Sequence, residues 1–292
     1  MKYSFVAQHK KRWPVDVMCR LMGINKNSYY SYQRRNKNKP IDLEYQELLD
    51  WVKKISESSD YTYGSRRIRR ALNALGYPVG RRRTRGLMKQ AGVFVRYRKR
   101  YKVTTNSNHK KPLFENVLQR QFTMAQPNQA YVSDITYIHT QEGWLYLAVV
   151  IDLFSRKVVG WSMGARMTTT LVCDALKMAI WQRKPAKGLI VHTDRGSQYA
   201  SHEYRRLLKM HGCIGSMSRK GNCWDNSVVE SFFGSLKQER VQWRHYKTRY
   251  EAQQDVLNYI AMWYNSFRLH SYLGYANPAQ FEWEWKNMKK IA

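Results

Sequence analysis

Hydrophobic residues recur at helical spacing in the first part of the chain. Pro14 suits the first position of a helix, and the apolar residues that follow share one face until Gly23 interrupts the pattern. A second helix, basic and rich in tyrosine, is expected over residues 26–35. Residues 1–40 are therefore predicted to form a first helix-turn-helix.

The same kind of pattern returns after a connecting helix, which is expected within residues 41–60. Two further helices are expected, one before Gly76 and a basic one after it, so residues 41–95 are predicted to hold the connecting helix and a second helix-turn-helix. Helical hairpins without a role in DNA binding have similar patterns. Residues 96–125 are basic, show no clear period and are predicted to be a linker.

The second half of the chain has a strand-like pattern instead. Strands are expected at residues 130–139, 144–151, 157–162, 188–193 and 214–217. Helices are expected between the last three strands and after the fifth, where Asp225 or Asn226 can begin a helix. This order predicts an α/β fold, a mixed five-stranded sheet with flanking helices as in ribonuclease-H-like domains, over residues 126–245. A helical tail is expected at residues 246–292.

Positive charge changes the expected function of the helical part. The chain has 51 Lys and Arg against 21 Asp and Glu, a net charge of +30, and residues 1–120 hold 29 of the basic residues but only 8 of the acidic ones. A single basic run is usually a solvated helix face, but four clusters with few acids between them favour a nucleic-acid partner. The arginines predicted to bind DNA are Arg66, Arg67, Arg81, Arg82, Arg83 and Arg85.

Other classes of function have weaker signals. The apolar runs fall short of the roughly 20 residues of a membrane span, and the basic N-terminus does not resemble a secretory signal. Glycine-rich phosphate loops are absent, and the histidines and four cysteines miss zinc-finger spacings. We therefore expect a protein that does not associate with membranes.

Three acids form the candidate site for chemistry. Asp134 interrupts the first predicted strand, Asp194 follows the fourth, and Glu230 lies on the helix after the fifth, with 35 residues between the last two acids. Singly, Asp134 could pair with an arginine, Asp194 could cap a helix and Glu230 could be a solvated helix residue. Together, three converging carboxylates would repel one another unless a divalent cation such as Mg²⁺ or Mn²⁺ lay among them. Two such ions can carry out phosphodiester transfer.

The segments around these acids, residues 134–137, 192–199 and 226–237, resemble the DDE motif of insertion-sequence transposases of the IS-three family. More narrowly, the chain is similar to OrfB, their second-frame product, in the retroviral-integrase superfamily. Residues 63–92 and 264–281 resemble the upstream helical region and the closing motif of this family. The zinc module of retroviral integrases is missing, which favours a bacterial element.

The resemblance implies that Asp134, Asp194 and Glu230 are catalytic and bind two Mg²⁺ ions per site, with Mn²⁺ able to substitute. It further implies metal-dependent cleavage and strand transfer of DNA at the inverted-repeat ends of the element, and joining to target DNA. Lys237 follows Glu230 by seven residues on the same helix face, and the resemblance assigns it a phosphate contact. The expected partners are DNA, at least one further copy of the chain and the product of the upstream frame, in the bacterial cytoplasm at the nucleoid.

Two alternatives remain open from the sequence. The chain could be a DNA-binding regulator with an inactive integrase-like domain, or a nonspecific nuclease of the ribonuclease H type. An assay on supercoiled DNA with Mg²⁺ or Mn²⁺ separates them, because a regulator gives no nicked or joined product and a nuclease gives no end-specific joining.

Overall fold

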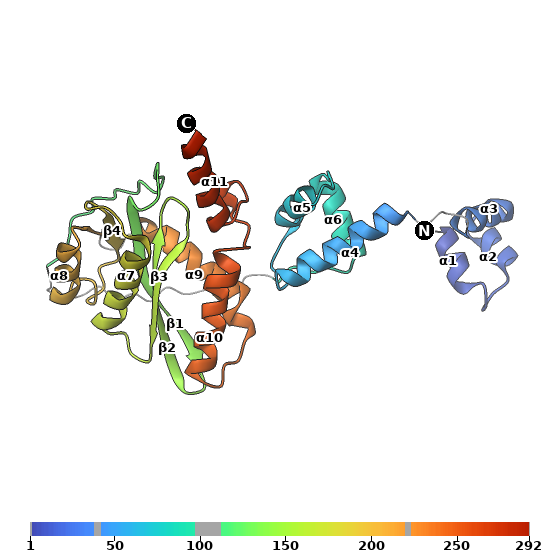
Figure 1. Ribbon diagram of the computed structural model, residues 1–292. Helices are drawn as coiled ribbons and strands as arrows, with labels where there is room; N and C mark the ends of the chain where they lie inside the picture. Colours follow the sequence, from blue (N-terminus) through green and yellow to red (C-terminus); the bar gives the residue numbers. More distant parts are fainter. Residues whose placement is uncertain (1, 38–41, 97–111, 220–222, 292) are drawn as a thin grey trace.

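Helices make up the first third of the chain, and a five-stranded sheet follows from Ala130 onwards (Figure 1). The computed structural model describes residues 2–37, 42–96, 112–219 and 223–291. In these four stretches no helix is long and apolar enough to cross a bilayer. The predicted order of elements is confirmed, with an additional helix at the N-terminus.

The first three helices are α1 (Lys2–His9), α2 (Val15–Leu21) and α3 (Lys26–Lys37). They surround a small core formed by Val6, Met18, Cys19 and Tyr29. Helix α1 was not expected, because its sequence has little apolar periodicity. Val6 is its one fully buried side chain. Gly23 has φ of +61° between α2 and α3, a conformation that glycine adopts without strain.

The next three helices form a second unit, which consists of α4 (Leu43–Ser58), α5 (Ser65–Ala74) and α6 (Arg81–Gln90). Asp42 caps α4, since its Oδ1 accepts a hydrogen bond from the Tyr45 N–H at 3.0 Å. The core of this unit includes Leu48, Val52, Ile68, Leu72 and Leu87. We refer to it below as the α4–α6 unit.

The predicted linker at 96–125 is only partly described, since residues 97–111 lie outside the described residues. Residues 112–125 contain neither helix nor strand, but they do not leave the domain. Leu118 is buried, and its N–H donates to Ser216 Oγ at 3.2 Å. This stretch is therefore part of the packed α/β domain.

The sheet has the strand order β3-β2-β1-β4-β5. Its strands are β1 (Ala130–Thr140), β2 (Gly143–Asp152), β3 (Val158–Gly164), β4 (Ile190–Thr193) and β5 (Ile214–Met217). Strands β1, β2 and β3 are antiparallel, whereas β4 runs parallel to β1 and β5 parallel to β4. The mixed five-stranded sheet predicted from the sequence is confirmed, and with its flanking helices it is ribonuclease-H-like.

Helices cover both faces of the sheet, because alternate residues of each central strand are apolar and buried on opposite sides. On one face lie α7 (Thr169–Arg183) and α8 (His202–Met210), and on the other lie α9 (Ser227–Glu239) and α10 (Arg249–Asn258). The sheet thus separates two hydrophobic cores.

The edge strand β3 is closed in by two contacts. A Cβ at Gly160 would lie 2.2 Å from the Ala175 carbonyl oxygen, so α7 can approach β3 this closely only at a glycine. Asn265 acts like a neighbouring strand, because its Oδ1 accepts from the Val158 N–H and its Nδ2 donates to the Val158 carbonyl, both at 3.0 Å. An exposed strand edge is thereby covered.

After α9 come the 3₁₀ turn η2 (Val241–Trp243), α10, the π-helical turn η3 (Tyr259–Tyr264), the turn η4 (Ser271–Leu273) and α11 (Pro278–Ile291). The expected helical tail, residues 246–292, contains α10, η3, η4 and α11. It completes the core beneath α9 with Tyr246, Ala252, Val256, Tyr259, Ile260 and Tyr264. The α/β domain therefore depends on residues well beyond 245 for its packing.

Candidate active site

Asp134 and Asp194 lie next to each other in the middle of the sheet. Strands β1 and β4 are parallel neighbours, and Ser133 is paired with Thr193 in their register. Each acid is the next residue after that pair, and adjacent strands are roughly 5 Å apart. Asp194 directly follows the carboxyl end of β4, where ligand crevices form in α/β sheets. The structure thus brings the first two predicted acids together.

Short local contacts orient the two carboxylates. The Ile135 N–H donates to Asp134 Oδ1 at 2.7 Å, and the Gly196 N–H donates to Asp194 Oδ1 at 2.9 Å. A Cβ at Gly196 would itself lie 2.9 Å from this Asp194 oxygen, so the turn closes around the carboxylate because residue 196 has no side chain. Both acids are half-buried and have limited freedom to turn away.

Glu230 lies near the start of α9 with an exposed side chain. Burial raises the pKa of Asp134 well above its usual range, the negative charges of Asp194 and Glu230 raise it further, and the Ile135 N–H and Lys237 act in the opposite direction. Partial desolvation by the surrounding protein also raises the pKa of Glu230. Both other predicted acids, Asp194 and Glu230, are therefore within electrostatic reach of Asp134.

The chemistry of these residues fits a hard divalent cation, because they offer carboxylate oxygens alone. The like charge that raises the pKa of Asp134 is what such a cation would neutralise. Within the described part of the chain, no three His, Cys, Asp or Glu side chains are spaced to enclose a metal ion as they stand. Asp134 and Asp194 are fixed, whereas Glu230 is exposed and not held by burial.

Lys237 lies on the side of α9 that faces β1. It is buried, and its Nζ lies over the Tyr137 ring at 4.7 Å from the centroid. Burial lowers the pKa of this ammonium group, while the charges of Tyr137 and Asp134 raise it. The alternative of an ordinary surface lysine does not fit this burial, and the ammonium charge acts directly on Asp134.

Asp225 is not the N-cap of α9, although it was one of the two residues expected to begin this helix. The residue at the N-cap of α9 is Asn226, and Asp225 is buried just before it. Its carboxylate accepts from Arg120 Nε at 2.6 Å, from Arg219 Nε at 3.2 Å and from the Arg219 N–H at 2.9 Å. Burial alone would raise the pKa of Asp225, but these donors lower it to about 2. Arg120 is 105 residues away in sequence, so no local pattern indicates this pairing.

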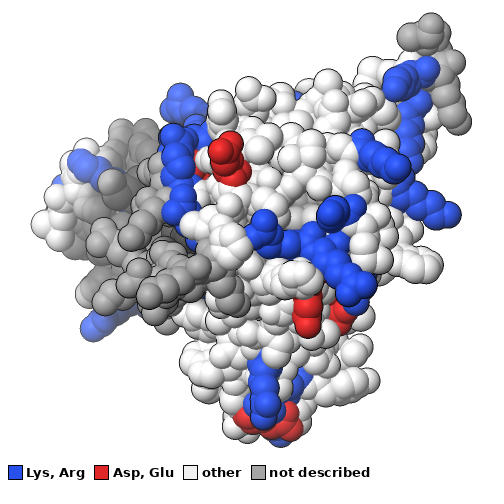
Figure 2. Space-filling model, turned by 90° about the vertical axis from the view of Figure 1, so that its left-hand side faces the viewer, with Lys and Arg blue, Asp and Glu red and all other residues white. Residues whose placement is uncertain are grey.

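Five of the six arginines predicted to bind DNA have exposed side chains. They are Arg66, Arg81, Arg82, Arg83 and Arg85. Arg67 is different, because it is half-buried, its Nε donates to the Leu269 carbonyl at 3.0 Å and its Nη1 lies 3.9 Å from Glu239 Oε1. Its guanidinium group is engaged within the chain, so a DNA contact is not supported for Arg67. Figure 2 shows that Lys and Arg also outnumber Asp and Glu on one face of the α/β domain.

His192, two residues before Asp194, is an internal residue of the domain. Its Nδ1 lies 2.9 Å from Ser216 Oγ and its Nε2 lies 3.2 Å from Ser218 Oγ. Burial lowers the pKa of His192 to about 4, so the ring is neutral at pH 7. Both ring nitrogens are taken up by serines, in agreement with the absence of a zinc-finger pattern in the sequence.

Family models match most of the chain. An integrase core domain matches residues 124–223, a second integrase core domain model matches residues 230–284, and an HTH-like domain matches residues 44–101. Together with the mixed sheet, these matches define the α/β domain as the integrase core of a polynucleotidyl transferase.

Whole-length relatives identify the family. Transposase InsF for insertion sequence IS3A of Escherichia coli (strain K12) is 41% identical over 97% of this chain and 98% of its own length. An insertion element IS600 31 kDa protein of Shigella sonnei is 39% identical over 93% and 99%. The chain belongs to the IS3 family of insertion-sequence transposases, enzymes of DNA transposition. This confirms the resemblance seen in the motifs, and none of these matches favours an inactive regulator.

A solved structure also aligns with the chain. The simian T-cell lymphotropic virus intasome, in complex with the PP2A regulatory subunit B56 gamma, matches 79% of this chain and 74% of the solved chain. The sequence identity is 16% and the TM-score is 0.47.

Proposed function

We propose that Asp134, Asp194 and Glu230 are the catalytic carboxylates of this transposase and that they hold two Mg²⁺ ions, which Mn²⁺ can replace. The observation that carries the proposal is the register of β1 against β4, which sets Asp134 beside Asp194. The influence of Glu230 on the pKa of Asp134 supports the inclusion of the third acid. Integrase core domains use divalent metal ions, and the number of ions at this site is part of the proposal.

The chemistry is the exchange of one phosphodiester bond for another. When bound, two divalent cations would activate the attacking oxygen and neutralise the charge of the leaving oxygen. The carboxylates of Asp134 on β1 and Asp194 directly after β4 are held rigidly, which supports the geometry of an in-line displacement. Lys237 places a positive charge beside Asp134 that suits a phosphate oxygen of the reacting strand.

We extend this proposal to the partners. The five exposed arginines of α5 and α6 would contact phosphates at the inverted-repeat ends of the element, and target DNA would meet the basic α/β domain. Two ends must be joined in one reaction, so the working form is at least a dimer. The upstream-frame product is a further partner or a fused segment, and the complex acts at the bacterial nucleoid.

The test uses Asp134→Asn, Asp194→Asn and Glu230→Gln with a duplex that carries the terminus of the encoding element and Mg²⁺. In each variant the rates of cleavage and joining should fall about a thousandfold or more, because the activation free energy rises by about 4 kcal/mol. The DNA affinity should be unchanged. Asp174→Asn is the matched control, because Asp174 is an exposed acid of α7 paired with Lys177 at 3.1 Å. Full activity of any one of the three variants removes that residue from the site.

A second readout does not depend on turnover. Mg²⁺ or Mn²⁺ at about 100 times its dissociation constant should stabilise the fold by about 2.7 kcal/mol and raise the melting temperature by several degrees, and EDTA should reverse the shift. Asp134→Asn and Asp194→Asn should abolish the rise, whereas Asp174→Asn should keep it. An unchanged rise in the first two variants would place the cations elsewhere.

A further inference from the structure

Helix α9 ends in an acidic residue where a helix does not favour one. Glu239 is the last residue of α9, at the negative end of the helix dipole, and only 5% of it is exposed. A buried carboxylate in that position destabilises the fold unless cations compensate it. Two arginines from different parts of the chain do so, Arg268 and Arg67.

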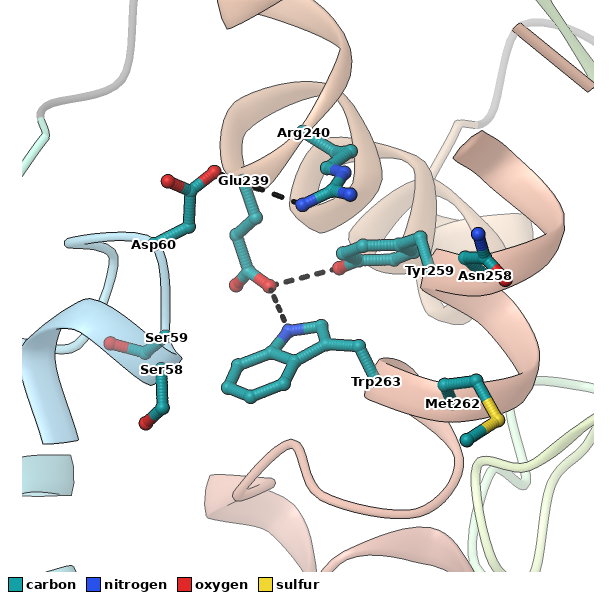
Figure 3. A pocket seen from close by; sticks show the side chains of 9 residues that line it. All are labelled: Ser58, Ser59, Asp60, Glu239, Arg240, Asn258, Tyr259, Met262 and Trp263. Atoms are coloured by element: carbon teal, nitrogen blue, oxygen red, sulfur yellow. Dashed lines mark hydrogen bonds and ion pairs between the residues drawn. The ribbon is translucent and has the colours of Figure 1, made fainter. Parts of the chain in front are cut away.

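Arg268 comes from the α/β domain itself. Its Nε lies 3.0 and 2.9 Å from the two Glu239 oxygens, and its Nη2 lies 2.6 Å from Oε1 and donates to Ser235 Oγ one turn earlier in α9. The Tyr259 hydroxyl and the Trp263 Nε1–H donate to Glu239 Oε2 at 2.9 and 3.4 Å (Figure 3). The last turn of α9 is thus anchored to the residues that follow it.

Arg67 comes from α5, and it connects the α4–α6 unit to the same carboxylate. Its Nη1 lies 3.9 Å from Glu239 Oε1, and its Nε donates to the Leu269 carbonyl. The Leu269 N–H in turn donates to the Tyr63 hydroxyl at 2.7 Å. We call this set, Glu239, Arg268, Arg67, Leu269 and Tyr63, the Glu239 junction.

The surroundings of the junction mix charged and apolar side chains and are incompletely filled. A cavity of about 210 Å³ lies between α4 and the end of α9, and its lining includes Asp60, Arg240 and Trp263 (Figure 3). The Asp60 carboxylate lies 4.0 Å from Arg240. Asp60 and Tyr61 have φ of +52° and +58°, a strained conformation for two consecutive residues with side chains, and such strain is often stored at functional positions. A hollow and strained contact is one that can shift, unlike a close-packed core.

Helix α9 connects this junction to the proposed site. Glu239 follows Glu230 by nine residues, about two and a half turns, so the two acids point to opposite sides of α9, about 13 Å apart along its axis. Val229, Phe232 and Leu236 pack α9 against the sheet, so a displacement at one end of the helix is carried to the other.

We infer that Arg67 is a positioning residue for strand transfer. Through Glu239 it sets the place of α9, and hence of Glu230 and Lys237, according to how DNA holds the α4–α6 unit. Its neighbour Arg66 is exposed on the same helix and is one of the proposed DNA contacts, so a phosphate held there lies one residue from the junction. The inference rests on the proposed function of Glu230.

The test compares Arg67→Met with Arg67→Lys in the full-length protein, without metal, using the element-terminus duplex as probe. Hydrogen exchange of residues 227–239 should slow about fivefold or more when the wild type binds the duplex. Arg67→Met should bind the duplex within about twofold of the wild type but lose this protection, and Arg67→Lys should restore part of it. With Mg²⁺ and saturating duplex, Arg67→Met should also join strands about tenfold more slowly.

Two further variants separate positioning from binding. Arg66→Met should weaken duplex binding yet keep the protection of residues 227–239 once the duplex is saturating. Lys53→Met, which removes an exposed cation of α4 paired with Asp50, should change neither quantity. If Arg67→Met does not fold, as judged by circular dichroism, Tyr63→Phe replaces it, because it removes the hydroxyl that holds Leu269.

Wild-type protection and a wild-type joining rate in Arg67→Met, or in Tyr63→Phe if it takes that place, would overturn the inference. The exchange readout needs no chemistry, so it stands apart from the proposed function. Full activity of Asp194→Asn and Glu230→Gln would refute the proposed acids, whereas loss of protection in Arg67→Met would still locate the coupling at the junction.

Discussion

Helix α6 of the α4–α6 unit and the interior of the α/β domain use arginine in opposite ways. In α6 the side chains of Arg81, Arg82, Arg83 and Arg85 are all exposed. In the α/β domain, by contrast, Arg183 lies inside the chain with its Nη2 2.8 Å from Glu282 and 3.3 Å from Asp152. Exposed cations are available to a partner that binds and leaves, whereas internal ion pairs fix one conformation of the fold.

Within the α/β domain the acids differ in the same sense. Asp225, Glu239 and Glu282 face arginines, and each has a pKa below its usual value even though burial alone would raise it. For Asp134, burial raises the pKa, and the negative charges of Asp194 and Glu230, which it faces instead of arginines, raise it further. The internal acids that stabilise the fold are matched with cations, while the proposed catalytic acids are set against one another. Such unfavourable placement is typical of functional sites.

The largest effect on stability is expected when an internal acid loses its cation. Arg268→Met should lower the free energy of unfolding by about 3–5 kcal/mol, because Glu239 stays buried and the more distant Arg67 is then its one nearby cation among the described residues. Urea denaturation measures this, with Lys53→Met as a surface control. The double variant Glu239→Met with Arg268→Met should recover much of the loss, since no charge then remains buried. A loss below about 1 kcal/mol in the single variant would put this pair on the level of a surface ion pair.

A gain in stability is expected when a proposed catalytic acid loses its charge. In metal-free protein at pH 7, Asp134→Asn should raise the free energy of unfolding by about 1 kcal/mol, because it removes a negative charge that burial, and then repulsion from Asp194 and Glu230, disfavour. Between the unfolded and the raised folded pKa of Asp134 the folded state binds more protons, so wild-type stability falls as pH rises through this range.

The advantage of Asp134→Asn should therefore disappear at a pH below the ordinary pKa of aspartate, where the wild-type carboxyl is protonated in both states. Thermal unfolding over a pH series checks the sign. An advantage independent of pH would mean that the negative charge of Asp134 is not its cause. Asp174→Asn serves as the control, because Asp174 is paired with Lys177 on the surface.

The smallest effects are expected for single exposed arginines. Arg82→Ala should weaken duplex binding by less than about 1 kcal/mol and reduce the slope of log affinity against log salt by about one, as for one phosphate contact. Titration over a range of salt concentrations measures both quantities. Arg20→Ala, in α2, is a matched exposed arginine that pairs with Asp16 at 3.1 Å. A slope unchanged by Arg82→Ala would exclude Arg82 from the DNA contact.

Local patterns in the sequence were sufficient for the order of elements, because apolar periodicity and turn residues act over a few positions. The strands and helices around Asp134, Asp194 and Glu230 were predicted in this way, and the motifs indicated the family. Of the two residues expected to begin the helix after the fifth strand, Asn226 is its N-cap and Asp225 is not. The pairing of Asp225 with arginines was not predicted, since these partners cannot be recognised from its neighbours in the sequence. For Arg67, a basic cluster gives no sign of which guanidinium turns inward.

The sequence by itself therefore determined the alternation of helices and strands, the basic character of the helical part and the three acids that a divalent metal would need. Only the tertiary structure decided that Asp134 and Asp194 are neighbours, that Asp225 serves the fold and that Glu239 connects α9 to the α4–α6 unit. The reason is one of range. Propensity and periodicity are local, whereas strand pairing brings together the two aspartates, which are 60 positions apart, and an ion pair joins Arg67 and Glu239, which are 172 apart.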